Sequence, residues 1–324
     1  MSGVSIAGLL LLHLPMSLFR CLSAVALVAA LASPAAAAPL ESALAPAYAL
    51  AGTEVHLLHA ERLKRDYELY VALPKSYATA ATRRYPVVFV TDAPYAFPLT
   101  RAIAARVGGH SDDLPEFILV GMGYAKGDTP EFSRRRDYTP SPNRDSGLTS
   151  DMPGRTPLFG EAAGYRRFVA EQVFPFIEAR YRTDMSRKVF AGHSYGALFG
   201  ADVLTTEPTL FQAYVLGSPS LWFDHRSLMA CQGSWFNAAG SPWQADVYLG
   251  VGAYEGRAPK GAKDAARYAT EGDMVADMQR FASALQTRRT RQLRLRAEVI
   301  PGEDHLTVAP ILITRGLKWA LGPR

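Results

Sequence analysis

The sequence predicts an α/β fold in which helices flank a mainly parallel central sheet, with antiparallel strands at its N-terminal edge. Short apolar runs rich in Val, Phe and Leu alternate with helix-compatible segments along the chain, which is typical of strand–helix–strand units. The first two runs alternate apolar and polar residues, whereas later runs are apolar throughout, as strands buried on both faces are. The pattern indicates neither a repeat nor a second domain, so we expect one layered domain over residues 54–324.

The first two expected strands, residues 54–59 and 66–74, alternate well enough to form a half-exposed antiparallel pair at the edge of the sheet. The other expected strands are residues 85–92, 117–123, 188–191, 213–219, 245–252 and 293–300.

Helices are expected at residues 161–182, where Phe168, Val173, Phe176 and Ile177 form one apolar stripe, and at about 273–287. Further helices are expected after Ser194 and after His305. Residues from about 124 to 160 are polar and rich in Pro, Arg, Asp and Gly. A loop of that length inside a compact domain is usually functional, so we expect it to contact the substrate.

The segment Gly192-His193-Ser194-Tyr195-Gly196 lies between an expected strand and a small-residue segment that can form a helix. A G-x-S-x-G sequence in this context is typical of a sharp turn that strains the serine backbone and projects its hydroxyl at the C-terminal edge of the sheet. The sequence therefore predicts Ser194 as a nucleophile, with a plain Gly-Ser turn as the alternative. Neighbouring side chains on such a turn point apart, so we interpret His193 as a packing or polar-edge residue and not as the base.

A serine nucleophile needs a base, and His305 follows the last expected strand directly. An acid that orients the imidazole should lie between the serine and the histidine in the chain. Glu255 stands at the end of the expected strand 245–252, so we predict it as the acid, with Asp264, Asp273 and Asp304 as rivals. A Ser-His dyad without an acid is the other alternative.

An oxyanion hole needs backbone N–H groups aimed at the developing negative charge. Tyr195, the residue after the nucleophile, is expected to supply one. The second should come from the loop after Asp92, where Pro94 has no N–H, so Ala93 or Tyr95 has to serve. We predict Tyr195 and Ala93 as the pair.

The composition is that of a soluble globular protein: of the 324 residues, 48% are hydrophobic and 20% are charged, and the formal net charge is +5. This charge is spread along the chain, so it gives no nucleic-acid footprint, although it is compatible with an anionic small molecule. We expect no nucleic-acid partner.

The N-terminal region resembles a secretory signal peptide. Arg20 is followed by an apolar run at residues 21–32 and by small residues at 33–38. We expect cleavage near Ala37 or Ala38, a cleaved segment of residues 1–38, and a leader over residues 39–53. A start at Met16 would give a more usual n-region than Met1. The run is short for a membrane span of about 20 residues, so we expect a periplasmic or secreted protein without stable membrane insertion after cleavage.

The chain has two cysteines, and Cys21 would leave with the signal peptide. Cys231 is then alone, which excludes an intramolecular disulfide and a cysteine-based metal site. We expect neither a metal nor another cofactor.

Five ordered motifs resemble those of the putative-esterase branch of the α/β-hydrolase superfamily. Within that branch the likeness is to predicted hydrolases that include siderophore trilactone esterases, with esterase D more distant. The motifs are residues 85–93 (YPVVFVTDA), 136–140 (RDYTP), 192–196 (GHSYG), 218–222 (SPSLW) and 302–305 (GEDH). The resemblance implies an α/β-hydrolase fold with Ser194 as nucleophile, His305 as base and Glu255 as acid. Some relatives use a Ser-His dyad without an acid.

The sequence and the resemblance together predict a metal-independent serine esterase that acts on a small ester or lactone through an acyl-enzyme. A siderophore lactone is one candidate substrate, and candidate substrate-binding residues are Tyr95, Arg136, Tyr138 and Trp222. Two alternatives stay open. An acyltransferase would use the same acyl-enzyme, and a catalytically idle binding module would keep the fold alone.

Overall fold

The computed structural model describes residues 48–108, 110, 113–145, 148–237, 244–270, 272–287 and 293–322. The predicted signal peptide and residues 39–47 of the predicted leader lie outside the described residues. The fold below is that of the compact unit Ala49–Arg324. None of its described helices is both long enough and apolar enough to span a membrane.

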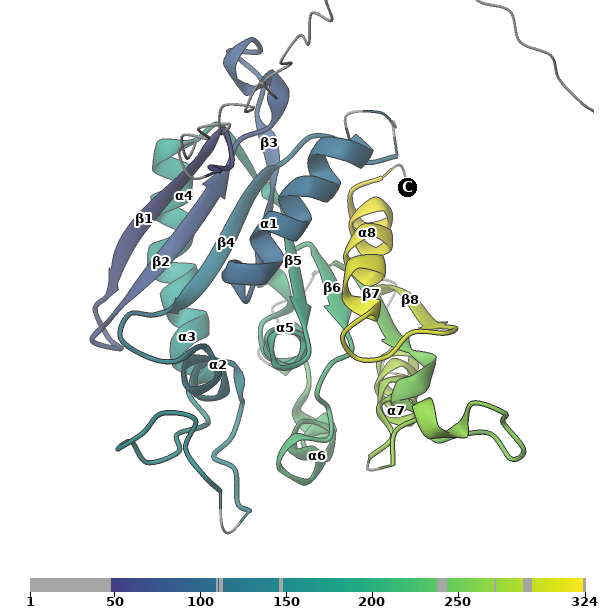
Figure 1. Cartoon of the computed structure of the whole chain (residues 1–324). Helices are drawn as coiled ribbons and strands as arrows, with labels where there is room; N and C mark the ends of the chain where they lie inside the picture. The colour runs from purple at the N-terminus through teal and green to yellow at the C-terminus, as the bar shows by residue number, and fades with distance from the viewer. Residues whose placement is uncertain are drawn as a thin grey trace, which may run out of the picture. The chain divides into compact units, whose positions relative to one another are not determined.

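Eight strands form one sheet in the order β1-β2-β4-β3-β5-β6-β7-β8 (Figure 1). β1 pairs with β2 and β2 with β4 in antiparallel fashion, and all other neighbours are parallel. The strands are β1 (Thr53–Ala60), β2 (Arg65–Ala72), β3 (Tyr85–Val90), β4 (Ile118–Ala125), β5 (Thr183–His193), β6 (Ala213–Gly217), β7 (Ala245–Gly252) and β8 (Leu293–Ile300). Each predicted strand coincides with one of these, and the antiparallel pair lies at the N-terminal edge as expected.

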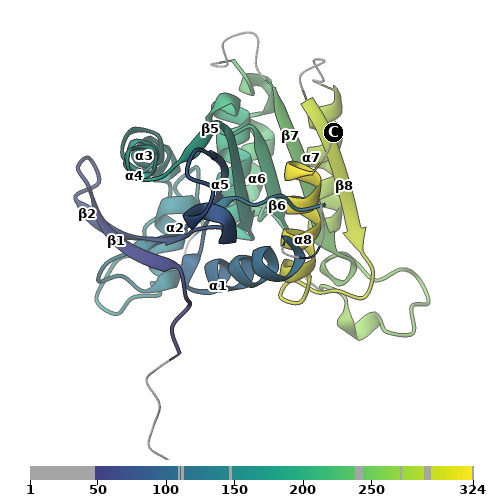
Figure 2. The same cartoon turned by 90° about the horizontal axis from the view of Figure 1, so that it is seen from above.

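Helices cover both faces of the sheet (Figure 2). One face carries α1 (Ala93–Ile103) and α8 (Val308–Leu321). The other carries α5 (Tyr195–Thr206), α7 (Met274–Thr287) and a continuous helical segment made of α3 (Ala162–Phe168), the π-helical η3 (Val169–Val173) and α4 (Phe174–Arg180). α2 (Pro130–Tyr138) follows β4, and α6 (Phe223–Ala230) follows β6. The short helices are η1 (Lys75–Ala78), η2 (Ala104–Gly108), η4 (Pro208–Leu210), η5 (Gln232–Ser234), η6 (Ala253–Glu255) and η7 (Ala265–Arg267).

The helices expected at residues 161–182, at 273–287, after Ser194 and after His305 are all present. The prediction of one long loop over residues 124–160 is wrong in part, because residues 130–138 of it form α2. α2 buries Ser133, Arg136 and Asp137 beside two aromatic residues. Its inner face is therefore partly charged, and the apolar periodicity that identifies a helix in a sequence is missing.

Two apolar cores result, one on each face of the sheet. The parallel strands between them are buried on both sides; β3 and β7, for example, are buried at every position. Because the C-terminal ends of parallel strands lie at one edge, the loops after β3, β5, β6, β7 and β8 come together there. That edge carries the residues singled out in the sequence.

Candidate active site

Ser194 occupies a strained turn between β5 and α5. Its backbone has φ 59° and ψ −120°, a conformation that costs a non-glycine residue of order 1–3 kcal/mol. The flanking glycines are required by close approach. A Cβ on Gly192 would lie 2.6 Å from the carbonyl carbon of Gly196, and one on Gly196 would lie 2.2 Å from Thr91 Oγ1. The turn therefore has the tight geometry that the sequence predicts.

Glu255 and His305 form a close pair at the same edge of the sheet. Glu255 lies in η6, directly after β7, and is 4% exposed; His305 follows β8. His305 Nδ1 lies 2.5 Å from Glu255 Oε2. Glu255 Oε1 accepts hydrogen bonds from Ser218 Oγ at 2.6 Å and from the Gly252 main-chain N–H at 2.7 Å. Both carboxylate oxygens are thus held, which fixes the direction from which the carboxylate meets the imidazole.

The other carboxylates considered as the acid make different contacts. Asp264 accepts from the Tyr254 hydroxyl, Asp273 from the main chain of α7 and Asp304 from the main chain of the turn before α8. Glu255 is the acid that the structure brings to His305.

The loop after β8 brings His305 close to the turn that carries Ser194, although β6 and β7 lie between β5 and β8 in the sheet. The ring of His193, the residue before Ser194, lies 4.6 Å from the His305 ring, measured between centroids. The hydroxyl of Ser194 lies 3.3 Å from Ser220 Oγ. The hydrogen bonds of the described residues do not include one between Ser194 and His305, and such catalytic contacts are often long before a substrate binds.

Ala93 and Tyr195, the predicted oxyanion donors, are the first residues of α1 and α5. The first N–H groups of a helix have no acceptor within the helix, so both are available to an anion. The two helices follow β3 and β5, which are neighbours in the sheet. The Tyr95 N–H donates to the Asp92 carbonyl at 3.2 Å. Of the two options left by Pro94, Ala93 is therefore the one whose N–H has no acceptor among the described residues.

Comparisons with known proteins identify the family to which the chain belongs. The model of the family described as "Putative esterase" matches residues 60–306. The chain belongs to this esterase family. It is 31% identical over 284 residues to the ferri-bacillibactin esterase BesA of Bacillus subtilis. The aligned region covers 86% of this chain and 92% of that protein. It is 30% identical over 176 residues to a siderophore enterobactin esterase of Emericella nidulans, which covers 51% of this chain and 58% of that protein.

A solved structure has a similar fold. An IroE-like serine hydrolase from Shewanella oneidensis matches with a TM-score of 0.68 at 25% identity, over 83% of this chain and 80% of its own. The protein is therefore an ester hydrolase with an α/β-hydrolase fold.

The esterase carries a buried charged group at the candidate oxyanion loop that sequence reasoning missed. Asp92, at φ 56°, is fully buried directly before Ala93. Arg134 of α2 binds both of its carboxylate oxygens, at 3.0 and 3.2 Å, and the Tyr124 hydroxyl donates to one of them at 2.8 Å. Burial and the neighbouring Asp92 carboxylate raise the pKa of Tyr124, so its hydroxyl stays a donor. The only sequence signal was an Asp at a strand end, which does not reveal its partner.

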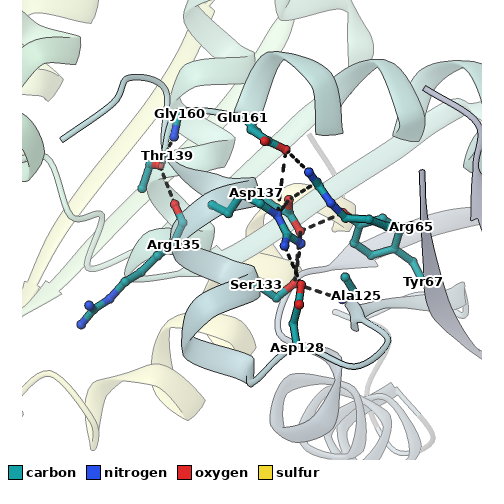
Figure 3. A network of polar contacts seen from close by, with 11 residues as sticks. Arg65, Tyr67, Ala125, Asp128, Ser133, Arg135, Asp137, Thr139, Gly160 and Glu161 are labelled. Atoms are coloured by element: carbon teal, nitrogen blue, oxygen red, sulfur yellow. Dashed lines mark hydrogen bonds and ion pairs between the residues drawn. The ribbon is translucent and has the colours of Figure 1, made fainter. Parts of the chain in front are cut away.

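Arg136 was predicted to bind substrate, and the structure shows it buried instead. It is 2% exposed, and its partners Asp128, Asp137 and Glu161 are labelled in Figure 3. Its guanidinium contacts Asp137 at 2.8 Å, Asp128 at 2.5 Å and, more weakly, Glu161 at 3.9 Å. Arg65 of β2 binds Asp137 and Glu161 from the other side. The network ties α2 to β2 and to the start of α3, so Arg136 is buried among carboxylates that it holds within the fold.

Tyr138, another predicted substrate contact, is also buried. It is 1% exposed, and its hydroxyl accepts a long hydrogen bond of 3.4 Å from the Asp92 main-chain N–H. Tyr138 thus lies beneath the site, against the loop that carries Ala93.

Tyr95 and Trp222 are the predicted substrate contacts that remain exposed, at 42% and 41%. The Trp222 ring lies 6.0 Å from the Tyr195 ring, whose other neighbours are Phe223 and the Arg134 guanidinium. These aromatic groups adjoin the turn that carries Ser194. Within the described ranges no group of three or more His, Cys, Asp or Glu side chains is arranged to hold a metal ion.

Proposed function

We propose that the protein is a serine esterase in which Ser194 is the nucleophile, His305 the base and Glu255 the acid. The observation that carries the proposal is the contact of 2.5 Å between His305 Nδ1 and Glu255 Oε2, made at the sheet edge where the strained turn presents Ser194. With the proton of the imidazole held at Nδ1, Nε2 is left as the acceptor that a serine hydroxyl requires. The N–H groups of Ala93 and Tyr195 are proposed as the oxyanion hole.

Chemistry then proceeds through an acyl-enzyme. The Ser194 oxygen attacks the ester carbonyl carbon while its proton passes to His305 Nε2. The two main-chain N–H groups stabilise the oxyanion, and Glu255 stabilises the imidazolium. His305 returns the proton to the leaving alkoxide as the ester C–O bond breaks. Water repeats the sequence, so the products are an acid and an alcohol and Ser194 is regenerated.

The proposed substrate is the ester or lactone linkage of a siderophore. Two relatives are named for such substrates, ferri-bacillibactin and enterobactin. The aromatic side chains Trp222, Tyr195 and Tyr95 beside the turn are suited to stacking on the aromatic groups of such ligands. We further propose export of the mature protein, on the evidence of the N-terminal residues 1–38.

A fluorophosphonate probe tests the catalytic assignment, because the serine oxygen displaces fluoride from phosphorus only when a base activates it. We expect one adduct on Ser194, located by intact mass and peptide mapping. The His305→Ala variant should react about 10²–10⁴-fold more slowly.

Ser220→Ala is the matched control, because its hydroxyl lies only 3.3 Å from that of Ser194. It should still be labelled, whereas Ser194→Ala should not. An adduct on Ser220, or no adduct on folded protein, would contradict the assignment.

The substrate class is tested separately. Enterobactin and bacillibactin, each with and without iron, are compared with a p-nitrophenyl ester, and products are followed by chromatography with Ser194→Ala as the blank. Hydrolysis of the simple ester without hydrolysis of either siderophore would refute the siderophore assignment and leave the esterase chemistry standing.

A further inference from the structure

His193 is a buried imidazole packed against His305. It is the last residue of β5 and is 8% exposed, and its ring plane makes an angle of 41° with that of His305 at 4.6 Å between centroids. Gly217 of β6 lies on another side, where an added Cβ would be 3.4 Å from His193 Cδ2. Ile313 of α8 lines the same small cavity as His193. The surrounding strand and helix therefore hold the His193 ring in place.

We propose that His193 is a positioning residue whose ring face holds the His305 imidazole in its productive orientation. This inference rests on the proposed function. Glu255 contacts His305 at one atom, Nδ1, and a single hydrogen bond leaves the imidazole free to turn about that bond. Packing against a second, fixed ring removes this freedom. Nε2 of His305 is then kept toward the turn that carries Ser194.

The charge state of His193 suits this role. Burial lowers its pKa to about 3, with the positive charges of His305 and Arg134 acting in the same direction and a hydrogen bond to the His305 main chain opposing them. His193 is therefore neutral at the pH at which an esterase works. When His305 takes up the Ser194 proton, it faces an uncharged ring and not a second cation, and the π face of a ring attracts a cation.

His193 contacts His305 through its ring face and through a hydrogen bond to the His305 main chain. His193 Nε2 is buried and has no hydrogen-bond partner among the described residues. A phenylalanine keeps the ring face and loses only the hydrogen bond to the His305 main chain, so it should cost much less activity than an alanine.

Steady-state kinetics on a p-nitrophenyl ester test the proposal. We expect His193→Ala to lower kcat by about 30-fold or more with KM nearly unchanged, because a misplaced catalytic group slows the chemistry without weakening binding. The fluorophosphonate labelling rate should fall by a similar factor. His193→Phe should stay within about threefold of the wild type, since it keeps a flat ring of similar size.

Val189→Ala is the matched control for lost packing. Val189 is buried in the same strand, β5, and does not take part in the site. Its variant should lower the melting temperature and leave kcat unchanged. The proposal is overturned if His193→Ala keeps kcat within twofold, if His193→Phe is as slow as His193→Ala, or if Val189→Ala at a similar melting temperature is equally slow.

Proton NMR provides a readout that does not depend on activity. The proton between His305 Nδ1 and Glu255 Oε2 should give a far-downfield signal in the wild type and in His193→Phe. In His193→Ala the signal should broaden, because a mobile ring exposes this proton to exchange with water. An unchanged signal in His193→Ala refutes the positioning role even if the wild type proves to be no esterase, whereas absent labelling of the wild type refutes only the proposed function.

Discussion

Glu255 Oε2 contacts His305, and Glu255 Oε1 accepts hydrogen bonds from Ser218 and Gly252. Because the two oxygens have different partners, an amide substitution tests the role of the carboxylate. In Glu255→Gln the amide oxygen should face the donors Ser218 and Gly252, because an amide N–H₂ there would leave the Gly252 N–H without an acceptor. The amide nitrogen then meets His305 Nδ1, which has to accept. The imidazole proton moves to Nε2, and Nε2 can no longer take a proton from Ser194.

We therefore expect Glu255→Gln to lower kcat by about 10²–10⁴-fold with a small change in KM. Ser218→Ala removes one donor from the same carboxylate and should cost about tenfold. Steady-state kinetics on one ester measure both variants. If Glu255→Gln keeps kcat within threefold of the wild type, His305 acts without an acid and the site is a Ser-His dyad.

The residues found from the sequence are those whose roles follow from chain order. Ser194 is marked by its glycines, and His305 and Glu255 by their positions after strands. Asp92 could not be recognised, because its importance depends on Arg134, which lies 42 residues away and reaches it only through the fold. Arg136 was misread although its closest partners, Asp128 and Asp137, are near it in the sequence, because its burial depends on how α2 packs in the fold.

At the scale of elements, the helices and strands that could be predicted from the sequence are those with a clear apolar pattern. The strands are apolar enough to be recognised, and their alternation with helices indicates a mainly parallel sheet, but the position of β4 between β2 and β3 was not predicted. α1 was not predicted, because Pro98 lies inside it and Pro94 in its first turn. α2 was not predicted either, because a helix that buries ion pairs lacks the apolar stripe by which a helix is recognised in a sequence.

The ion pair between α3 and α5 makes a pH-dependent contribution to the free energy of unfolding. Asp202 of α5 is 7% exposed and lies 3.2 Å from Arg166 of α3. Burial raises its pKa to about 6, against the opposing effect of Arg166. Between about pH 4 and 6 the folded state therefore binds more protons than the unfolded chain, and the stability contributed by this group falls as the pH rises.

The Asp202→Asn variant lacks this titration. The free energy of unfolding of the wild type, minus that of the variant, should therefore fall by up to about 3 kcal/mol between pH 4 and pH 7. Urea denaturation of both proteins at several pH values in this range measures the difference. A difference that stays constant or rises with pH would show that Asp202 is ionised throughout.

On the scale of the whole molecule, the site depends on how closely α8 sits on the sheet, because His305 lies three residues before that helix. Glycines make the close approach possible. A Cβ on Gly316 of α8 would lie 2.2 Å from Val215 Cγ1 of β6, and one on Gly250 of β7 would lie 2.2 Å from Leu312 Cδ2 of α8. The helix α8, which packs in the second core, thus holds the proposed base near the turn that carries Ser194.

Gly316→Val should therefore disturb stability and catalysis together. The added side chain cannot fit between α8 and β6, so the helix has to move outward, at a cost of about 1–3 kcal/mol in the free energy of unfolding. Arg315→Val is the matched control, because it places the same residue on an exposed position of the same helix, where the lost pair with Glu298 is worth at most about 1 kcal/mol. Urea denaturation and kcat, measured at a temperature where both variants are folded, should show losses for Gly316→Val alone. If Gly316→Val is destabilised but keeps the kcat of Arg315→Val, the loop before α8 holds His305 independently of the helix, and the contacts with Glu255 and His193 suffice to position it.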